Sequence, residues 1–166
     1  MATKTSYKST LVRFAVVIAI LCSASLHAQT PPPYGAPITL EEAKKPAAAA
    51  LAEAARNKWT MAVAIVDPGG NLVYFEKMDN TQLGSINIAI DKARTAALYK
   101  RPTKALQDAL AAGGAGLLIL GVRDATPVAG GNPLIEDGKI VGAIGVSGDA
   151  PEHDDQCSLA GAVLVK

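Results

Sequence analysis

The sequence predicts an α+β fold built around an antiparallel sheet. Two pairs of short apolar runs, each joined by a glycine-containing turn, have the pattern of β-hairpins. Stretches rich in small and apolar residues at helical spacing precede, separate and follow these pairs. The order helix, hairpin, helices, hairpin, helix is typical of helices packed against an antiparallel sheet, and it predicts the class.

The first 28 residues have the pattern of a signal peptide. Three basic residues precede an apolar run from Phe14 to Leu21, and Ser25 to Ala28 supply a cleavage site. The apolar run is short for a membrane span, and no second run follows it. We therefore expect a secreted or periplasmic protein that has no membrane attachment after cleavage.

The mature chain has the length of one domain. Cleavage after Ala28 removes 28 of the 166 residues and leaves 138. It also removes three of the 16 basic residues and none of the 15 acidic ones, so the net charge becomes −2. Without a basic run, nucleic acid is not an expected partner. Cys157 is then the only cysteine, which excludes an intrachain disulfide and favours a buried thiol.

The first half of the mature chain predicts a tether, a helix and a hairpin. Residues 29–38 contain four prolines, which predict an extended tether. Thr39 and Glu42 form a capping box that opens a helix to Lys58, and Pro46 within it predicts a kink or a restart. The hairpin strands are expected at residues 61–66 and 72–77.

The second half predicts more helices and a second hairpin. Arg101-Pro102 separates the first two helices, and Gly113-Gly114 ends the second one. The last helix is expected to take Asp149 as its N-cap, with Glu152 as the capping-box carboxylate. The expected elements are helices at residues 85–99, 103–111 and 151–164, hairpin strands at 128–135 and 139–146, and a strand or buried turn at 117–122.

The glycines of the last predicted strand mark a candidate site. Gly142, Gly145 and Gly148 interrupt a β-branched run, which indicates the close approach of a ligand or of another backbone. The strand leads into a helix start, where small ligands are often held. Gly130 and Gly131 indicate either a backbone bulge or turn, or a close approach of the backbone to a ligand.

His153 is the only histidine after cleavage, which excludes a multi-histidine zinc site. It stands four residues before Cys157, so the two form a candidate soft pair for a metal ion or a haem iron. The neighbouring acidic residues, Glu152, Asp154 and Asp155, are candidates for a functional role. Alternatively, they only stabilise the start of the helix, because a helix N-terminus favours negative charge.

Lys92 lies on a helix of otherwise small residues. It can pair with Asp154 or Asp79, hold a carboxylate such as a haem propionate, or simply face solvent. Arg101 and Thr103, at a helix junction, are candidates for an anion site or for ordinary helix caps.

Several motifs together resemble one family. They are Ala64–Leu72 with Met78-Asp79, Asp91–Ala96, Arg101–Thr103, Gly130–Leu134, Asp137-Gly138, Gly142–Gly148 and Asp154-Asp155. In this order they resemble the GlcG/HbpS family of haem-binding and haem-associated proteins, with its PduO C-terminal-like domains. The resemblance assigns residues 39–166 to one such domain, and the chain departs from the family pattern at Pro46 and Asn132.

The resemblance implies a profilin-like α/β sandwich with a sheet of about five strands, assembled as a homo-oligomer. It also implies haem as the cofactor, for capture, buffering or sensing, with degradation as a further activity. The expected contacts are Lys92 or Arg101 for the propionates, His153, a tyrosine or a threonine for the iron, and Thr103, Gly131 and Ser147 in the matched motifs.

Two other hypotheses stay open. In one, the same pocket binds a small carboxylic acid such as glycolate, which Lys92 holds while Asp154 acts as general base. In the other, the protein is a structural oligomer whose glycines serve packing alone. Whether any reaction is catalysed is left open by the sequence.

Overall fold

A four-stranded antiparallel sheet lies between helices in the computed structural model, which describes residues 30–165. From Pro31 onward the described residues form one compact unit with its own core. The strands are β1 (Ala62–Val66), β2 (Leu72–Lys77), β3 (Gly131–Glu136) and β4 (Lys139–Ser147), in the order β2-β1-β4-β3. The predicted α+β class is confirmed, but about five strands is wrong because the sheet has four.

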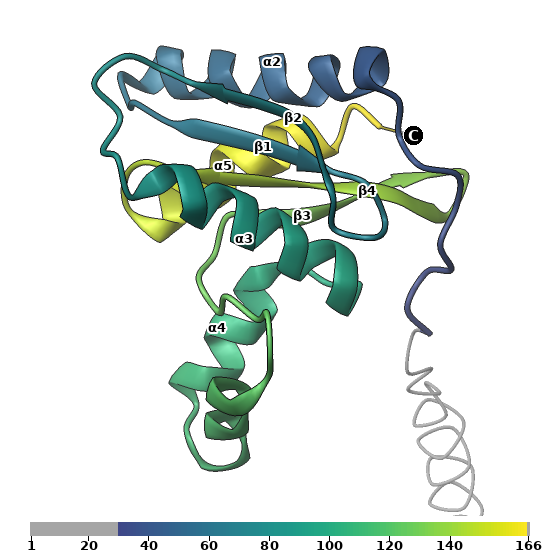
Figure 1. Cartoon of the computed structure of the whole chain (residues 1–166). Coiled ribbons are helices and arrows are strands. Elements are labelled where there is room, and N and C mark those ends of the chain that lie inside the picture. The colour runs from purple at the N-terminus through teal and green to yellow at the C-terminus, as the bar shows by residue number, and fades with distance from the viewer. Residues whose placement is uncertain (1–29, 166) are drawn as a thin grey trace, which may run out of the picture. The chain divides into compact units, whose positions relative to one another are not determined.

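Helices cover both faces of this sheet (Figure 1). On one face lie α2 (Leu40–Asn57) and α5 (Pro151–Ala162), and on the other lies α3 (Ser85–Tyr99). After α3 come α4 (Thr103–Ala111) and a 3-10 helix, η1 (Gly114–Gly121). The helices other than η1 lie close to their predicted positions. Within residues 30–165 no helix is long and apolar enough to cross a membrane.

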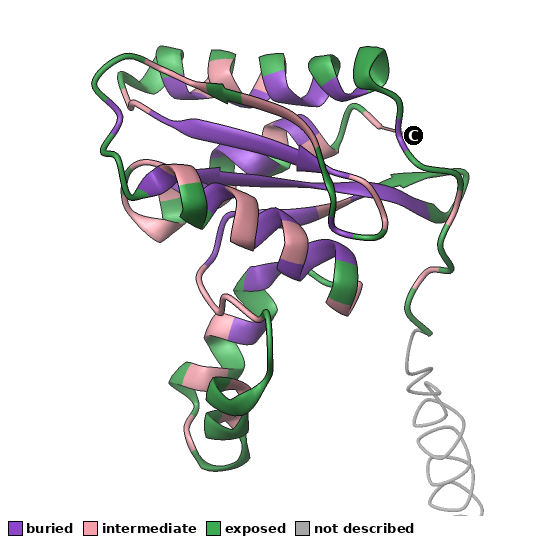
Figure 2. Ribbon diagram, viewed as in Figure 1, coloured by how far each residue is buried: buried purple, intermediate pink, exposed green. Residues whose placement is uncertain are grey.

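The two faces of the central strands carry side chains of different size. Toward α2 and α5, the larger residues Val63, Ile65 and Ile144 pack against the helix alanines. Toward α3, the alanines of β1 and β4 meet the alanines of the helix, so the backbones approach closely. A Cβ on Gly145 would lie 2.0 Å from the carbonyl oxygen of Ala89 in α3. All of β1 is therefore buried between two helical layers (Figure 2).

The predicted N-terminal cap is present at α2 but not at α5. The capping box at α2 is confirmed, because the Glu42 carboxylate accepts from the Thr39 backbone N–H at 2.8 Å. The helix continues through the buried Pro46, so no restart occurs there. The predicted N-cap of α5 is wrong: Ala150 holds that position, and Asp149 accepts from the N–H of Ala150 instead.

The described part of the proline-rich segment, residues 30–38, pairs with the sheet. Ile140 donates its N–H to Pro33 at 2.8 Å and accepts from Gly35 at 2.8 Å. This contact lies beyond the end of β1, where β4 would otherwise have an unpaired edge. The predicted signal peptide lies outside the described residues.

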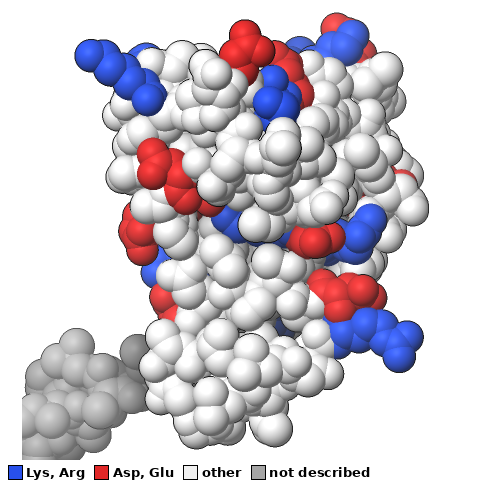
Figure 3. Space-filling view, turned by 60° about the vertical axis from the view of Figure 1, so that its left-hand side comes forward, with Lys and Arg blue, Asp and Glu red and all other residues white. Residues whose placement is uncertain are grey.

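The segment α4–η1 forms an arm that leaves the sheet (Figure 1). The predicted strand or buried turn at residues 117–122 is wrong, because this run belongs mostly to the exposed 3-10 helix η1. On the face drawn in Figure 3, the end of the arm carries no charged side chain. An apolar run predicts burial only where something covers it, and here the described part of the chain leaves the leucines exposed.

Candidate functional site

A buried ion pair joins the middle of α3 to the first turn of α5. The Lys92 ammonium donates to Asp154 Oδ2 at 2.6 Å and to the Val146 carbonyl at 3.1 Å. Their side chains are only 1% and 3% exposed. The other carboxylate oxygen of Asp154 accepts from the N–H of Asp149 at 3.2 Å. Of the two carboxylates considered for Lys92, the structure therefore selects Asp154 rather than Asp79.

Burial changes the proton affinity of both partners. Removal from water lowers the pKa of Lys92 and raises the pKa of Asp154, because it disfavours each charged form. The attraction between the two charges opposes both shifts. The short hydrogen bond shows that each group compensates the buried charge of the other.

Two glycines at the start of β3 pass directly over this pair. Gly130 has a φ of +117°, and a Cβ there would lie 2.8 Å from Asp154 Cβ and 3.0 Å from Lys92 Nζ. A Cβ on Gly131 would lie 2.4 Å from the Lys92 carbonyl oxygen. The chain itself thus occupies the space that these glycines leave open. No space for a ligand therefore remains beside Gly130 and Gly131.

Backbone also lies against the two glycines of β4, Gly142 and Gly145, and against Gly148 just after the strand. A Cβ on Gly142 would lie 2.4 Å from the carbonyl of Val66, and one on Gly148 would lie 2.0 Å from the carbonyl of Thr60. Gly145 meets α3 in the same way. At these three glycines it is therefore backbone, and not a ligand, that comes close.

Thr103 and Ser147 are buried and use their hydroxyls within the chain. The Thr103 hydroxyl accepts from the Gly131 N–H at 2.9 Å, which ties the start of α4 to β3. The Ser147 hydroxyl donates to the hydroxyl of Ser85 at 3.2 Å. Gly131 therefore lies between the Thr103 side chain and the backbone of Lys92.

His153 faces away from this cluster. Its ring stacks on Trp59 with centroids 3.9 Å apart and an interplanar angle of 11°. Nδ1 is buried and lies 3.5 Å from an Asp149 carboxylate oxygen, without hydrogen-bond geometry. The His153 side chain as a whole is 39% exposed.

The remaining predicted metal and anion ligands also lie apart. Cys157 is fully buried, and burial raises the pKa of its thiol to about 12. Arg101 is exposed and donates to the Tyr99 carbonyl at 3.1 Å. Among residues 30–165, no group of three His, Cys, Asp or Glu side chains is placed to hold a metal ion.

An apolar groove opens beside the helix junction. It has a volume of about 360 Å³, and its walls come from the tether, the α3–α4 junction, β3, β4 and the end of α5. Lys100 is the charged residue among those that line it. Asn132, the departure noted from the family pattern, also lines it and donates to Ser158 at 2.7 Å. The other lining residues are Pro32, Pro102, Pro133, Ile135, Ile140, Leu159, Ala162, Val163 and Val165.

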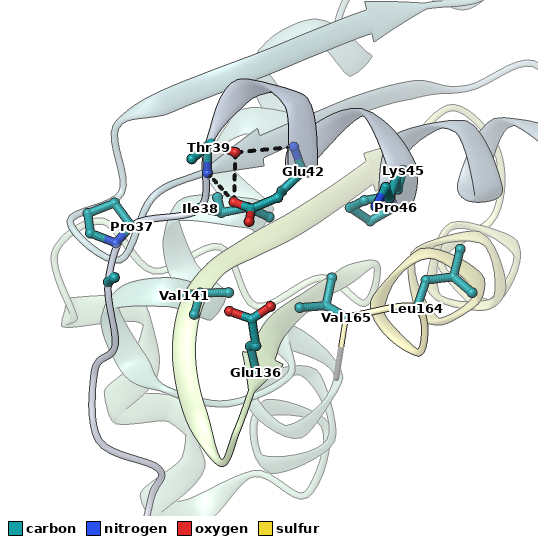
Figure 4. Close-up of a pocket in the computed structure, with 11 residues that line it drawn as sticks. Pro37, Ile38, Thr39, Glu42, Lys45, Pro46, Glu136, Val141, Leu164 and Val165 are labelled. Carbon is teal, nitrogen blue, oxygen red and sulfur yellow. Dashed lines mark hydrogen bonds between the residues drawn. The ribbon is translucent and has the colours of Figure 1, made fainter.

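A second cavity, of about 350 Å³, lies between the start of α2 and the end of the chain (Figure 4). Ile38, Val141 and Val165 form apolar walls, and the carboxylates of Glu42 and Glu136 border it. Glu42 is already bound to Thr39 in the capping box. Lys92 and Asp154 line neither of these two cavities, and in the structure the Lys92 ammonium is bound to Asp154 and to the Val146 carbonyl rather than to a small acid.

The sequence pointed to Lys92, Asp154, Thr103 and Gly131, which the structure brings together. It missed Lys100 and the proline walls of the groove, because their only signal was the helix break at Arg101-Pro102. The tether, the α3–α4 junction, the β3–β4 hairpin and the end of α5 build the groove from separate parts of the sequence, and no local pattern predicts that they meet.

A comparison with protein-family models assigns the chain to a class of haem-associated proteins. Residues 38–163 match the HbpS-like family, described as "Haem degrading protein HbpS-like", and the chain belongs to this family. This confirms the resemblance found in the sequence.

The chain is similar to several known members. It is 37% identical to protein GlcG of Escherichia coli K12 over 100 residues, which are 60% of this chain and 73% of GlcG. A double mutant of Streptomyces reticuli HbpS is similar in structure, with a TM-score of 0.72, 32% identity, and coverage of 80% of this chain and 89% of HbpS. The complex of PduOC with haem has a TM-score of 0.70 at 25% identity, and covers 78% of this chain and 96% of PduOC.

Proposed function

We propose that this protein binds haem in the apolar groove, as a secreted protein that captures, buffers or senses haem. The observation that carries the proposal is the groove itself, an apolar hollow of about 360 Å³ with a lysine in its lining. Membership of the HbpS-like family supports the choice of ligand, because one similar structure is a haem complex.

The groove fits the chemistry of a porphyrin. The apolar faces of the macrocycle would contact Pro102, Pro133 and Leu159, and this contact would remove apolar surface from water. The two propionates would stay near solvent beside Lys100 and the adjacent, exposed Arg101, in charge-assisted hydrogen bonds. Lys92 takes no part in this, because its ammonium is bound to Asp154 and Val146 inside the protein.

The iron has a separate candidate ligand. Of the described residues that line the groove, none is His, Cys, Met or Tyr. His153, the histidine among residues 30–165, is 39% exposed, and an imidazole nitrogen is a common ligand of haem iron. Because haem carries its iron at the centre of the macrocycle and His153 does not line the groove, the groove and His153 are two alternative sites for the whole cofactor.

Haem degradation is a further activity that the family description supports. Bound haem itself supplies the redox chemistry for such a reaction, whereas this chain would hold and orient the macrocycle. The proposed location outside the cytoplasm rests on the signal-peptide pattern of the first 28 residues.

The test is a hemin titration of the chain from Gln29 onward, followed by the Soret absorption. Leu159→Glu places a charge in the groove and should abolish saturable binding, whereas Leu164→Glu, in the second cavity, is the matched control and should leave it intact. His153→Ala should change the Soret position only if His153 ligates the iron. The absence of a saturable Soret shift in the wild type would refute the haem proposal. A loss of haem binding with His153→Ala but not with Leu159→Glu would indicate a haem site at His153 instead of the groove.

A further inference from the structure

One tyrosine fastens the tether to the end of α3. The Tyr34 hydroxyl donates to the Ala97 carbonyl at 3.0 Å and to the Leu98 carbonyl at 3.2 Å. Carbonyls in the last turn of a helix have no partner within the helix, so the hydroxyl supplies a donor that α3 itself lacks. This contact joins the two segments across more than half of the described chain.

The ring of the same tyrosine contacts Lys100. The Lys100 ammonium lies 4.0 Å from the centroid of the Tyr34 ring, within the range of a cation–π attraction. Lys100 is the C-cap of α3 and has a φ of +54°, a left-handed conformation that is costly for a residue with a Cβ. The ring therefore orients a side chain that starts from a strained backbone position.

The tether and Lys100 meet at the apolar groove. Pro32, Lys100 and Ile140 all line it. Ile140 is also the residue of β4 that makes two backbone hydrogen bonds with the tether. The tether thus forms one wall of the groove, and the Tyr34 hydroxyl holds this wall against α3.

This wall has little support from the core. No residue from Pro31 to Pro37 is buried, and Tyr34 is 43% exposed. Ile38, at the end of the tether, is the first residue that joins the core. Segments with few buried apolar contacts open locally at a lower free-energy cost than the core does. The tether can therefore leave β4 as far as Ile38 while the sheet stays intact.

We propose that the tether is a movable wall of the groove, that Tyr34 locks it closed, and that a ligand leaves the groove when this wall opens. The ligand step rests on the proposed haem site, whereas the lock does not. An open tether takes Pro32 out of the groove and removes the ring that orients Lys100. Tyr34 is therefore a positioning residue, which acts on the ligand through these two neighbours.

The first experiment measures hydrogen exchange by NMR on the chain from Gln29 onward, without hemin. The N–H groups of Gly35 and Ile140 report on the closed tether, because each is bonded across the tether–β4 contact. Tyr34→Ala should speed their exchange on the order of 10-fold or more, because it removes the hydroxyl bonds and the cation–π contact. Tyr34→Phe, which keeps the ring, should have a smaller effect. Unchanged exchange in Tyr34→Ala would overturn the proposal.

Two controls separate opening of the tether from a general loss of stability. The N–H groups of β1, which is buried along its whole length, should exchange as slowly in Tyr34→Ala as in the wild type. Tyr74→Phe removes a hydroxyl bond to Glu76 on β2 and should leave Gly35 and Ile140 unchanged. Faster exchange in β1 by the same factor would mean that the whole domain opens, which contradicts a movable wall.

The second experiment measures the rate at which bound hemin passes to an excess of apomyoglobin. Tyr34→Ala should release hemin on the order of 10-fold faster than the wild type, and Tyr34→Phe should lie between them. Bound hemin should in turn slow exchange at Gly35 and Ile140 in the wild type, because the coupling is reciprocal. A tether with a purely structural role would not respond to hemin.

The outcomes distinguish this proposal from the haem proposal. A wild type that binds no hemin would refute the haem proposal, while exchange without hemin would still decide whether Tyr34 locks the tether. Hemin that binds but leaves Tyr34→Ala and the wild type at the same rate would overturn the link between the tether and the ligand.

Discussion

Removing one partner of the Lys92–Asp154 pair should destabilise the protein strongly. Lys92→Met keeps the length of the side chain but leaves the Asp154 carboxylate buried without its cation. Breaking a buried pair in this way costs about 3–5 kcal/mol, because an uncompensated charge remains in the interior. That is a large share of the roughly 5–15 kcal/mol by which most domains are stable.

The double variant separates the charge from the packing. Lys92→Met with Asp154→Leu removes both charges, and it should recover most of the loss, except for about 1 kcal/mol each from the lost hydrogen bonds at the Asp149 N–H and at the Val146 carbonyl. The assay is urea unfolding followed by circular dichroism, for the wild type, both single variants and the double variant. A single variant that costs less than about 1 kcal/mol, or a double variant that costs the sum of both, would refute the reasoning.

Two further predictions concern packing and acid stability. Gly145→Ala should destabilise by about 1–3 kcal/mol or more, because the added Cβ meets the carbonyl of Ala89, while Gly84→Ala, with nothing within 4 Å, should change the urea midpoint little; equal effects would contradict this. Hydrogen bonds from the side chain and then the backbone of Thr39 hold the pKa of Glu42 below its ordinary value of 4.5. The stabilisation is thus present above about pH 4.5 and lost as the pH falls through the lower, folded-state pKa, so the stability gap between wild type and Glu42→Gln should shrink at low pH. A gap that stays constant to pH 2 would show that the carboxylate charge is not involved.

Local signals predicted most of the fold. The capping box at Thr39, the turn at residues 67–71 and the helix break at Arg101-Pro102 act within a few residues of chain, so their elements lie close to the expected bounds. The run at residues 117–122 shows the limit of this reasoning. Its apolar character gives no information on which part of the molecule, or which second molecule, covers it.

The sequence indicated which residues of the site are unusual, but not which contacts they make. Lys92 was recognised as out of place among small residues, but its choice of Asp154 over Asp79 depends on a contact across 62 residues of sequence. The glycines of β4 correctly indicated close approach. Whether a ligand or a backbone comes close is decided by the packing of α3 and β1, which no spacing within β4 records.

The burial of Cys157 makes the thiol a reporter of transient opening. With its pKa raised to about 12 and no exposed surface, the thiol forms little reactive thiolate at neutral pH while α5 stays packed on the α2 face. In the chain from Gln29 onward it is also the only cysteine. The rate at which a thiol reagent modifies this chain therefore depends on how often α5 opens. Compared with the rate for an exposed thiol, it gives the free energy of this local opening without denaturant.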